Sequence, residues 1–138
     1  MKQENNDFTY QIRVFYEDTD AGGIVYYANY LKFAERARTE WLRALGINQS
    51  TFLEQNLGFV VRRVEMDNKA SAKLDDLLTI TTTITLIKKA SLVFQQSIVN
   101  QHGKVICNVT VLVASVNLQK SKPCAIPSPI LGALTSAR

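Results

Sequence analysis

The first segment of the chain alternates between apolar and polar residues. From residue 8 to residue 16 every second side chain is apolar, which is the period of a strand with one buried face. The apolar positions are Phe8, Tyr10, Ile12, Val14 and Tyr16. The acidic, glycine-containing residues 17–23 follow directly and predict a turn that ends this strand.

The pattern changes at Tyr27, after which apolar residues recur at intervals of three and four. This period predicts a long amphipathic helix that packs lengthwise on a sheet. Its apolar face is expected to hold Tyr30, Phe33, Ala34, Ala37, Trp41 and Leu45, and its polar face Lys32, Glu35, Arg36, Arg38, Glu40 and Arg43. Gly46 stands where a glycine commonly ends a helix. A weaker pattern in residues 48–56 predicts another short helix, with Gly58 ending it.

The rest of the chain is typical of strands. Four runs are rich in β-branched and other apolar residues. They span residues 59–70, 77–87, 91–100 and 105–117. Polar residues with a glycine at 100–104 predict a hairpin turn between the last two runs. Prolines in the tail after residue 119 exclude a central strand there, and residues 130–134 are expected to pack a final turn on the core.

The order of these elements, a strand, a long helix and four further strands, predicts the architecture. Consecutive strands joined by short turns favour an antiparallel meander, and one helix can cover one face of such a sheet. We therefore expect an α+β fold in which a five-stranded antiparallel sheet curls around a central helix, with residues 1–138 forming a single domain. An unprotected edge strand invites a second copy of the chain, so a homodimer with a continuous sheet is expected.

Composition and charge narrow the function classes. The net charge of +4 is spread along the chain without a basic cluster, which argues against nucleic-acid binding. Cys107, in an apolar run, is expected to be buried, and the spacing of the two cysteines gives neither a metal site nor a disulfide framework. The N-terminus lacks the apolar core of a signal peptide, and no apolar run is long enough to span a membrane. These features favour a cytoplasmic protein.

The stretch YEDTDAGGIVYYANY places an acidic turn directly before the long helix. Asp18 and Asp20 do not fit a calcium loop, because Asn29 stands where a bidentate glutamate is needed. The glycine pair is not a dinucleotide-binding fingerprint, and the chain is too short and too antiparallel for an aspartate-dependent phosphatase. His102 lies in a polar hairpin turn, which argues against a nucleophilic triad.

After these exclusions, the remaining candidate is chemistry by a carboxylate at the start of the helix. The unpaired N–H groups and the positive dipole at a helix N-terminus can stabilise a developing oxyanion. Asp18 or Asp20, held a few residues away, could attack a carbonyl or activate a water molecule. Without a catalytic histidine the substrate must itself be reactive. A thioester fits, because its carbonyl is electrophilic and a thiolate leaves with little help from an acid.

Residues 20–30, DAGGIVYYANY, followed by Phe33 and by ERAR at 35–38, resemble the signature of hotdog-fold acyl-CoA thioesterases of the 4-hydroxybenzoyl-CoA thioesterase family. The resemblance is closest to the YbgC-type branch, the Tol-Pal-associated acyl-CoA thioesterases of bacteria, and it runs through nearly the whole chain. Further similar pieces are FVVR at 59–62, LDDL at 74–77, SLVF at 91–94 and KP at 122–123.

The resemblance implies a hotdog fold and hydrolysis of acyl-CoA to a free acid and coenzyme A, without a cofactor or metal. It also implies that Asp20 is the catalytic carboxylate, as nucleophile or as general base, and that the backbone N–H of Tyr27 polarises the thioester carbonyl. Asp18 is then a turn residue, and the phenol of Tyr27 has a packing role. A histidine often takes the place of Tyr27 in the YbgC-type branch. This difference affects the assignment of the branch and of the substrate more than the assignment of the reaction.

Basic residues are implied at the mouth of the site, because coenzyme A carries several phosphate charges. Lys88 and Lys89 fall where the family has such contacts, and Lys122 could contribute from the tail. The implied partners are acyl-CoA, a second copy of the chain in a dimer or in a tetramer of dimers, and acyl carrier protein. Two rival functions remain, a non-catalytic acyl-binding module of the same fold and a hotdog dehydratase, which His102 is poorly placed to serve.

Overall fold

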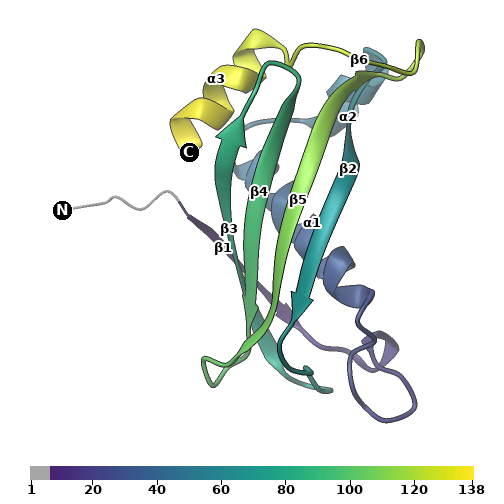
Figure 1. Cartoon of the computed structure of the whole chain (residues 1–138), viewed down its shortest axis with the longest axis vertical. Coiled ribbons are helices and arrows are strands. Elements are labelled where there is room, and N and C mark those ends of the chain that lie inside the picture. Colours follow the sequence, from purple (N-terminus) through teal and green to yellow (C-terminus); the bar gives the residue numbers. More distant parts are fainter. Residues whose placement is uncertain (1–6) are drawn as a thin grey trace, which may run out of the picture.

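An antiparallel sheet curls around a long helix, and a short C-terminal helix lies at one end of the sheet (Figure 1). The computed structural model describes residues 7–138. Its elements in chain order are β1 (Phe8–Arg13), a 3₁₀ turn η1 (Tyr16–Asp18), α1 (Asn29–Ala44), α2 (Gln49–Glu54), β2 (Leu57–Asn68), β3 (Leu77–Ile87), β4 (Ser91–Val99), β5 (Val105–Asn117), β6 (Lys122–Pro123) and α3 (Ser128–Ala137). The predicted α+β fold is confirmed, with the two-residue β6 as an addition to the five main strands.

The strands lie across the sheet in the order β1–β3–β4–β5–β2, and β6 pairs with β5. The hairpins β3–β4 and β4–β5 are those predicted from the sequence. The simple meander predicted for the last four strands is wrong, because β2 pairs with β5 and not with β3. The remaining edge of β3 is taken by β1, where Ile12 lies opposite Leu78. Residues 69–76 therefore carry the chain across the end of the sheet from β2 to β3 (Figure 1).

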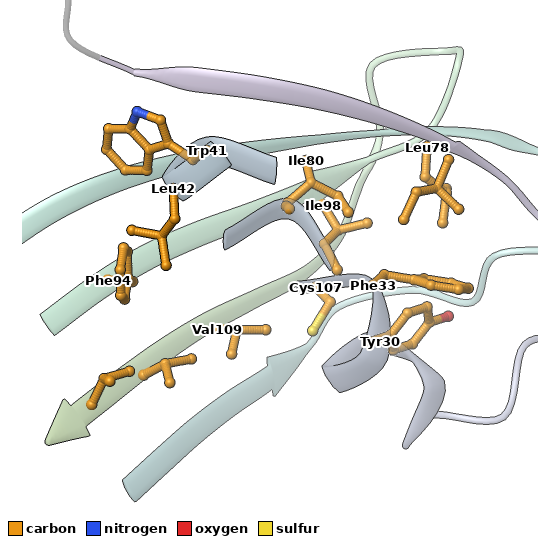
Figure 2. Close-up of a cluster of buried hydrophobic side chains, with 14 of the residues drawn as sticks. Tyr30, Phe33, Trp41, Leu42, Leu78, Ile80, Phe94, Ile98, Cys107 and Val109 are labelled. Atoms are coloured by element: carbon orange, nitrogen blue, oxygen red, sulfur yellow. The ribbon is translucent and has the colours of Figure 1, made fainter. Parts of the chain in front are cut away.

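Helix α1 packs its apolar face on the concave side of the sheet (Figure 2). The predicted face is buried at Tyr30, Phe33, Ala34, Ala37 and Trp41. These residues meet side chains of three neighbouring strands, among them Leu78 and Ile80 of β3, Phe94 and Ile98 of β4 and Val109 of β5. Aromatic contacts add to this packing, since the Trp41 ring lies edge-on to that of Phe94 with 6.2 Å between the centroids.

A glycine in the left-handed conformation ends α1, as the sequence predicts. Gly46 has a φ of +81°. Its N–H donates to the Arg43 carbonyl at 2.9 Å, and the N–H of Ile47 donates to the Leu42 carbonyl at 2.8 Å. These two bonds satisfy carbonyl groups of the last turn that would otherwise lack partners.

We predict that Gly46→Ala lowers the free energy of unfolding by about 1 kcal/mol, because a side chain is strained at this positive φ. Gly132→Ala is the matched control, since that glycine lies inside α3 and an added Cβ meets nothing within 4 Å. The control is expected to be neutral or stabilising by up to about 1 kcal/mol. Urea unfolding of both variants measures the difference, and equal effects at the two positions would contradict the assignment of Gly46.

Three expectations about single residues are wrong. Tyr16 does not continue the buried face of the first strand, because β1 stops at Arg13 and Tyr16 opens the η1 turn with 80% of its side chain exposed. Arg38 does not lie on a solvated helix face but is only 8% exposed. Gly58 does not end α2, because it is buried inside β2, and the chain reverses at Asn56, whose φ is +60°.

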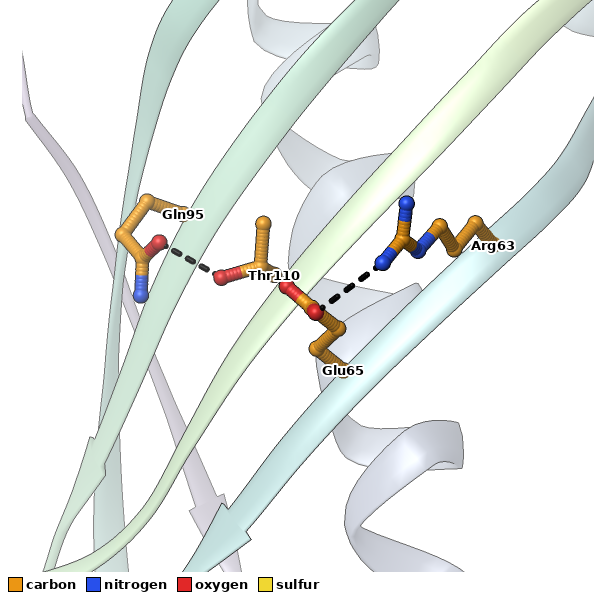
Figure 3. A network of polar contacts seen from close by, with 4 residues as sticks. All are labelled: Arg63, Glu65, Gln95 and Thr110. Atoms are coloured by element: carbon orange, nitrogen blue, oxygen red, sulfur yellow. Dashed lines mark hydrogen bonds and ion pairs between the residues drawn. The ribbon is translucent and has the colours of Figure 1, made fainter.

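The face of the sheet that points away from α1 carries polar pairs (Figure 3). Thr110 of β5 donates a hydrogen bond of 2.7 Å from its hydroxyl to the Gln95 side-chain oxygen of β4. On β2, Arg63 and Glu65 form an ion pair of 3.2 Å. Gln95 and Thr110 alternate with core residues along β4 and β5, so the period of two predicted from the sequence separates the two faces of the sheet there.

Candidate active site

The loop between β1 and α1 is fixed to the end of the sheet by main-chain hydrogen bonds. The N–H of Val25 donates to the Ala72 carbonyl at 2.9 Å, and the N–H of Leu74 donates to the Gly23 carbonyl at 3.2 Å. Thr19 and Val25 also pair as an isolated antiparallel bridge that closes the loop. The loop therefore follows a defined path before α1 begins.

Asp20 forms the first corner of a tight turn inside this loop. Its carbonyl accepts from the N–H of Gly23 at 3.1 Å, and its own N–H donates to the Ile24 carbonyl at 2.9 Å. Gly23 has a φ of +74°, a conformation that favours glycine. The Oδ1 atom of Asp20 accepts from the N–H of Gly22 at 2.9 Å. Within residues 7–138 the Oδ2 atom has no hydrogen-bond donor, and the side chain is exposed.

Asp18 has a structural role, which confirms the prediction that it is a turn residue. It is only 8% exposed, and its Oδ2 accepts from the N–H of Phe15 at 2.8 Å. The side-chain amide of Asn29 donates both to its Oδ1 and to its carbonyl oxygen, each at 3.3 Å. The loop is thereby tied to the first residue of α1. Sequence reasoning missed this role of Asn29, and its only signal was a polar residue at the start of an apolar helix face.

Tyr27 lies two residues before α1 and leaves its backbone N–H without an acceptor in the part of the chain that the structure describes. The N–H of Ala28 likewise has no acceptor among the described residues, whereas those of Asn29, Tyr30 and Leu31 donate to the carbonyls three residues earlier. The free N–H of Tyr27 stands at the positive end of the helix dipole, where it can bind an oxygen that gains negative charge.

The side chain of Tyr27 is 58% exposed and contacts the Tyr26 ring at a centroid distance of 5.0 Å. Its predicted packing role is therefore limited to this pair, and it does not enter the core. Phe15 and Tyr16, at 60% and 80% exposure, extend the exposed aromatic surface around the loop. In a single chain, this end of the fold is open to solvent, and its exposed aromatic residues stand among charged ones such as Glu17 and Asp20.

The three lysines predicted to contact coenzyme A lie far from Asp20 within one chain. The Asp20 loop adjoins the beginning of β3, where Arg13 pairs with Leu77. Lys88 and Lys89 follow the other end of that strand. The 11 residues of β3 span about 35 Å at the usual rise of a strand. Strand β6, which contains Lys122, also lies at the distant end (Figure 1).

A groove runs between α1 and β2. Its outer part has a volume of about 260 Å³, and its inner part, of about 70 Å³, shares Glu35, Arg38 and Val61 with it. The apolar residues that line the outer part include Leu31, Val64 and Val111, and those that line the inner part include Leu92, Phe94 and Leu134. We call this the α1–β2 groove. Neither Asp20 nor Tyr27 lines it.

Arg38 lies where the two parts of the groove meet, and a buried polar network holds it. Its Nη1 donates to the Gln96 Oε1 at 3.0 Å, and the Gln96 Nε2 donates to the Ala34 carbonyl at 2.9 Å and to the Thr82 hydroxyl at 3.0 Å. Burial lowers the pKa of the Arg38 guanidinium, and the negative charge of Glu35 partly offsets this. The sequence held one signal for this network, a glutamine at an inward position of β4.

Other candidate groups have no catalytic environment. Cys107 is buried as predicted, and burial raises the pKa of its thiol to about 11, so the thiol stays protonated at neutral pH. His102 is exposed in the β4–β5 turn. Residues 7–138 contain no group of three His, Cys, Asp or Glu side chains that could hold a metal ion. No helix in the same range has both the length and the apolar character needed to cross a membrane.

Known proteins similar in sequence to this chain include thioesterases. A sequence profile described as the thioesterase-like superfamily matches residues 14–134, a range that includes Asp20, Tyr27 and the strands β2 to β5 but not β1. The chain belongs to this superfamily. An acyl-CoA thioesterase YbgC from Haemophilus influenzae is 47% identical over 130 residues, which cover 94% of this chain and 95% of that protein.

Solved structures agree with the fold. A 1,4-dihydroxy-2-naphthoyl-CoA thioesterase from Synechocystis has a TM-score of 0.88 at 21% identity and covers 94% of this chain and 96% of its own. A probable thioesterase from Bartonella henselae has a TM-score of 0.82 at 35% identity, covering 88% of this chain and 99% of its own. The predicted hotdog fold and the resemblance to YbgC-type thioesterases are therefore confirmed.

Proposed function

We propose that this thioesterase hydrolyses acyl-CoA to a free carboxylic acid and coenzyme A, with Asp20 as the catalytic carboxylate and the Tyr27 N–H as the oxyanion donor. One observation carries the proposal. A single fixed loop at the start of α1 holds both an unengaged carboxylate oxygen and an unengaged backbone N–H. The name of the Haemophilus relative supports acyl-CoA as the substrate class.

In the proposed reaction, the thioester carbonyl oxygen accepts a hydrogen bond from the Tyr27 N–H. The negative charge that this oxygen gains in the transition state then lies beside the positive end of the α1 dipole. Asp20 either attacks the carbonyl carbon to form a mixed anhydride, which water hydrolyses, or removes a proton from the attacking water. In both routes the carbon–sulfur bond breaks and coenzyme A leaves as a thiolate.

Release of free thiol from acyl-CoA by the full chain tests the hydrolase, and a panel from short aliphatic through aromatic to long-chain substrates reveals the preferred acyl group. A single turnover in ¹⁸O water tests the nucleophilic role of Asp20. Label enters its carboxylate when water opens the anhydride at Asp20, whereas direct attack of water leaves Asp20 unlabelled. A chain that binds acyl-CoA but releases no thiol would be an acyl-binding module, and the hydrolase proposal would be wrong.

We further propose that a homodimer forms through β2, with a tetramer of dimers as the higher assembly. This edge strand is 12 residues long, lies at the end of the strand order next to β5 alone, and exposes Val60 at 40% outside the α1–β2 groove. Lys88, Lys89 and Lys122 of one chain would then contact the phosphates of coenzyme A whose thioester lies at Asp20 of the other chain.

The resemblance to the YbgC-type branch supports two finer parts of the proposal. A cytoplasmic location, close to the Tol-Pal system, fits that branch. Acyl carrier protein is a second candidate donor of the acyl group, because the same kind of thioester would meet Asp20 and the Tyr27 N–H. Thiol release from an acylated carrier protein, measured beside acyl-CoA of the same chain length, tests this second donor.

Mixed dimers test whether a site draws on two chains. The two chains are an Asp20→Asn variant and a Lys88→Glu/Lys89→Glu variant, each impaired alone, which are unfolded and then refolded together in equal amounts. Half of the dimers then contain one chain of each kind, and each of these mixed dimers has one intact site of two. We predict that the mixture regains about a quarter of wild-type activity. Thiol release at a low acyl-CoA concentration measures the recovery. Absence of recovery, with mixed dimers present by mass spectrometry, would show that these lysines do not serve the Asp20 of the other chain.

A further inference from the structure

Arg38 is a buried cation that forms no ion pair with an acidic residue in the range 7–138, although the charge of Glu35 acts on it. No carboxylate in this range lies within 4.0 Å of its nitrogens, and its one hydrogen bond goes to the neutral amide of Gln96. Glu35, one turn earlier on α1, has an exposed side chain. A guanidinium has five N–H donors, so most of those of Arg38 remain without an acceptor in the described chain. Burial of a charge in this state is unfavourable unless an anion completes the site.

The polar network fixes the guanidinium in place. Gln96 cannot turn its amide without losing the bonds to the Ala34 carbonyl and the Thr82 hydroxyl, so its oxygen stays directed at Arg38. The guanidinium carbon also lies 5.9 Å from the centre of the Phe94 ring. Arg38 is therefore a prepared donor group in the wall of the α1–β2 groove, at the junction of its outer and inner parts.

The groove leads from the start of α1 toward this donor. Leu31 lies one turn after Tyr27, and with Val64 and Val111 it lines the outer part, which continues to Arg38. Eleven residues separate Tyr27 from Arg38, which is about 16 Å along the axis of a helix. Side chains of a helix lean toward its N-terminus, so the guanidinium lies closer to Tyr27 than that. The walls of the outer part combine these apolar residues, which suit methylene groups, with the charged Lys32 and Glu35. The Arg38 guanidinium suits a carboxylate, which it can bind through two hydrogen bonds.

We propose that the α1–β2 groove binds the acyl chain and that Arg38 selects acyl groups whose far end carries a second carboxylate. The preferred substrates are then monothioesters of medium-length dicarboxylic acids, with the thioester at the Tyr27 N–H and the free carboxylate at Arg38. This inference rests on the proposed function, because it places the acyl group relative to that catalytic site. Arg38 acts as a specificity-determining residue and takes no part in bond breaking.

The test compares kcat/KM for two acyl-CoA substrates of equal chain length, one with a terminal carboxylate and one with a terminal methyl group. For the wild-type chain we expect a preference of roughly 10- to 100-fold for the carboxylate, which is the usual effect of hydrogen bonds to a charged group. Arg38→Gln is expected to abolish or reverse this ratio. Arg36→Gln is the matched control, because Arg36 lies on the exposed side of the same helix and does not line the groove. It should keep the wild-type ratio.

A second variant covers the case in which Arg38→Gln does not fold. Gln49→Glu leaves Arg38 and its network in place but adds a carboxylate to the wall of the inner part of the groove. This carboxylate competes for the guanidinium, so the ratio should again fall toward one. A wild-type ratio near or below one, or a ratio that neither Arg38→Gln nor Gln49→Glu lowers, would overturn the inference.

Binding measurements separate this inference from the proposed hydrolysis. If no acyl-CoA releases thiol, the proposed function fails, and non-hydrolysable thioether analogues of coenzyme A then test Arg38 by itself. Titration calorimetry should show roughly 10-fold or tighter binding of the carboxylate-ended analogue than of the methyl-ended one, with the difference lost in Arg38→Gln. Equal affinities of the two analogues for the wild-type chain would refute the role of Arg38.

Discussion

Asp20→Asn is expected to lower kcat for thioester hydrolysis by roughly 10²- to 10⁴-fold, the usual contribution of a catalytic acid or base. An amide can neither attack the carbonyl nor accept a proton from water. The side-chain oxygen of asparagine can still accept from the Gly22 N–H, which holds the turn in the wild-type chain at 2.9 Å. The variant should therefore fold and assemble normally, and circular dichroism together with light scattering checks this beside the kinetics.

Asp75→Asn is a suitable control for this experiment. Asp75 lies in the adjoining segment before β3, is exposed, and has a φ of +71°, which asparagine tolerates well. The kcat of the Asp75→Asn variant should stay close to the wild-type value. If Asp20→Asn kept a kcat similar to that of this control, another residue would carry the chemistry.

The second large effect concerns stability. Phe33→Ala is expected to lower the free energy of unfolding by about 3–5 kcal/mol, because Phe33 is fully buried beneath α1 and its removal leaves a cavity. Its ring also packs edge-on to Tyr30, with 6.3 Å between the centroids. Since small domains are stable by only about 5–15 kcal/mol, this loss is a large fraction of the total. Urea unfolding, followed by fluorescence of Trp41, measures it.

Leu53→Ala provides the comparison for this substitution. Leu53 lies on α2 and is 56% exposed, so its truncation leaves no cavity and should change stability by less than about 1 kcal/mol. If Phe33→Ala cost no more than Leu53→Ala, the packing of α1 on the sheet would differ from that described above. The contrast between the two variants tests the burial of the helix independently of any enzymatic assay.

Local patterns were sufficient to predict the elements. The bounds of β3 and β5 agree with the predicted residues 77–87 and 105–117, because alternation and β-branched side chains report directly on a strand with one buried face. The order of strands could not be obtained in this way. The partner of β2 depends on which strand edge remains available after β1 has paired with β3, and that is decided by contacts between segments far apart in the sequence.

For a similar reason, the parts of the candidate site that lie close together in the sequence were predicted, and the contacts between distant residues were not. The acidic turn and the period of the helix pointed only to Asp18 or Asp20 beside a helix start, because these patterns depend on residues close together in the chain. The choice of Asp20 and of the Tyr27 N–H came from the resemblance to the thioesterase family. Arg38 was assigned to the solvated face, because a helical period cannot foresee a partner 58 residues away in β4. The separation of Lys88 from Asp20 likewise follows from the length and direction of β3.

The hydrogen bonds between Asp18 and Asn29 join the loop to the first residue of α1. In the proposed reaction, an arriving thioester would find the Asp20 carboxylate and the Tyr27 N–H already in position, without closure of this loop before chemistry. Stabilisation of the transition state by such preorganised dipoles carries no reorganisation cost during the reaction. Discrimination between acyl groups must then arise along the walls that receive the chain, and not from an induced movement of the catalytic loop.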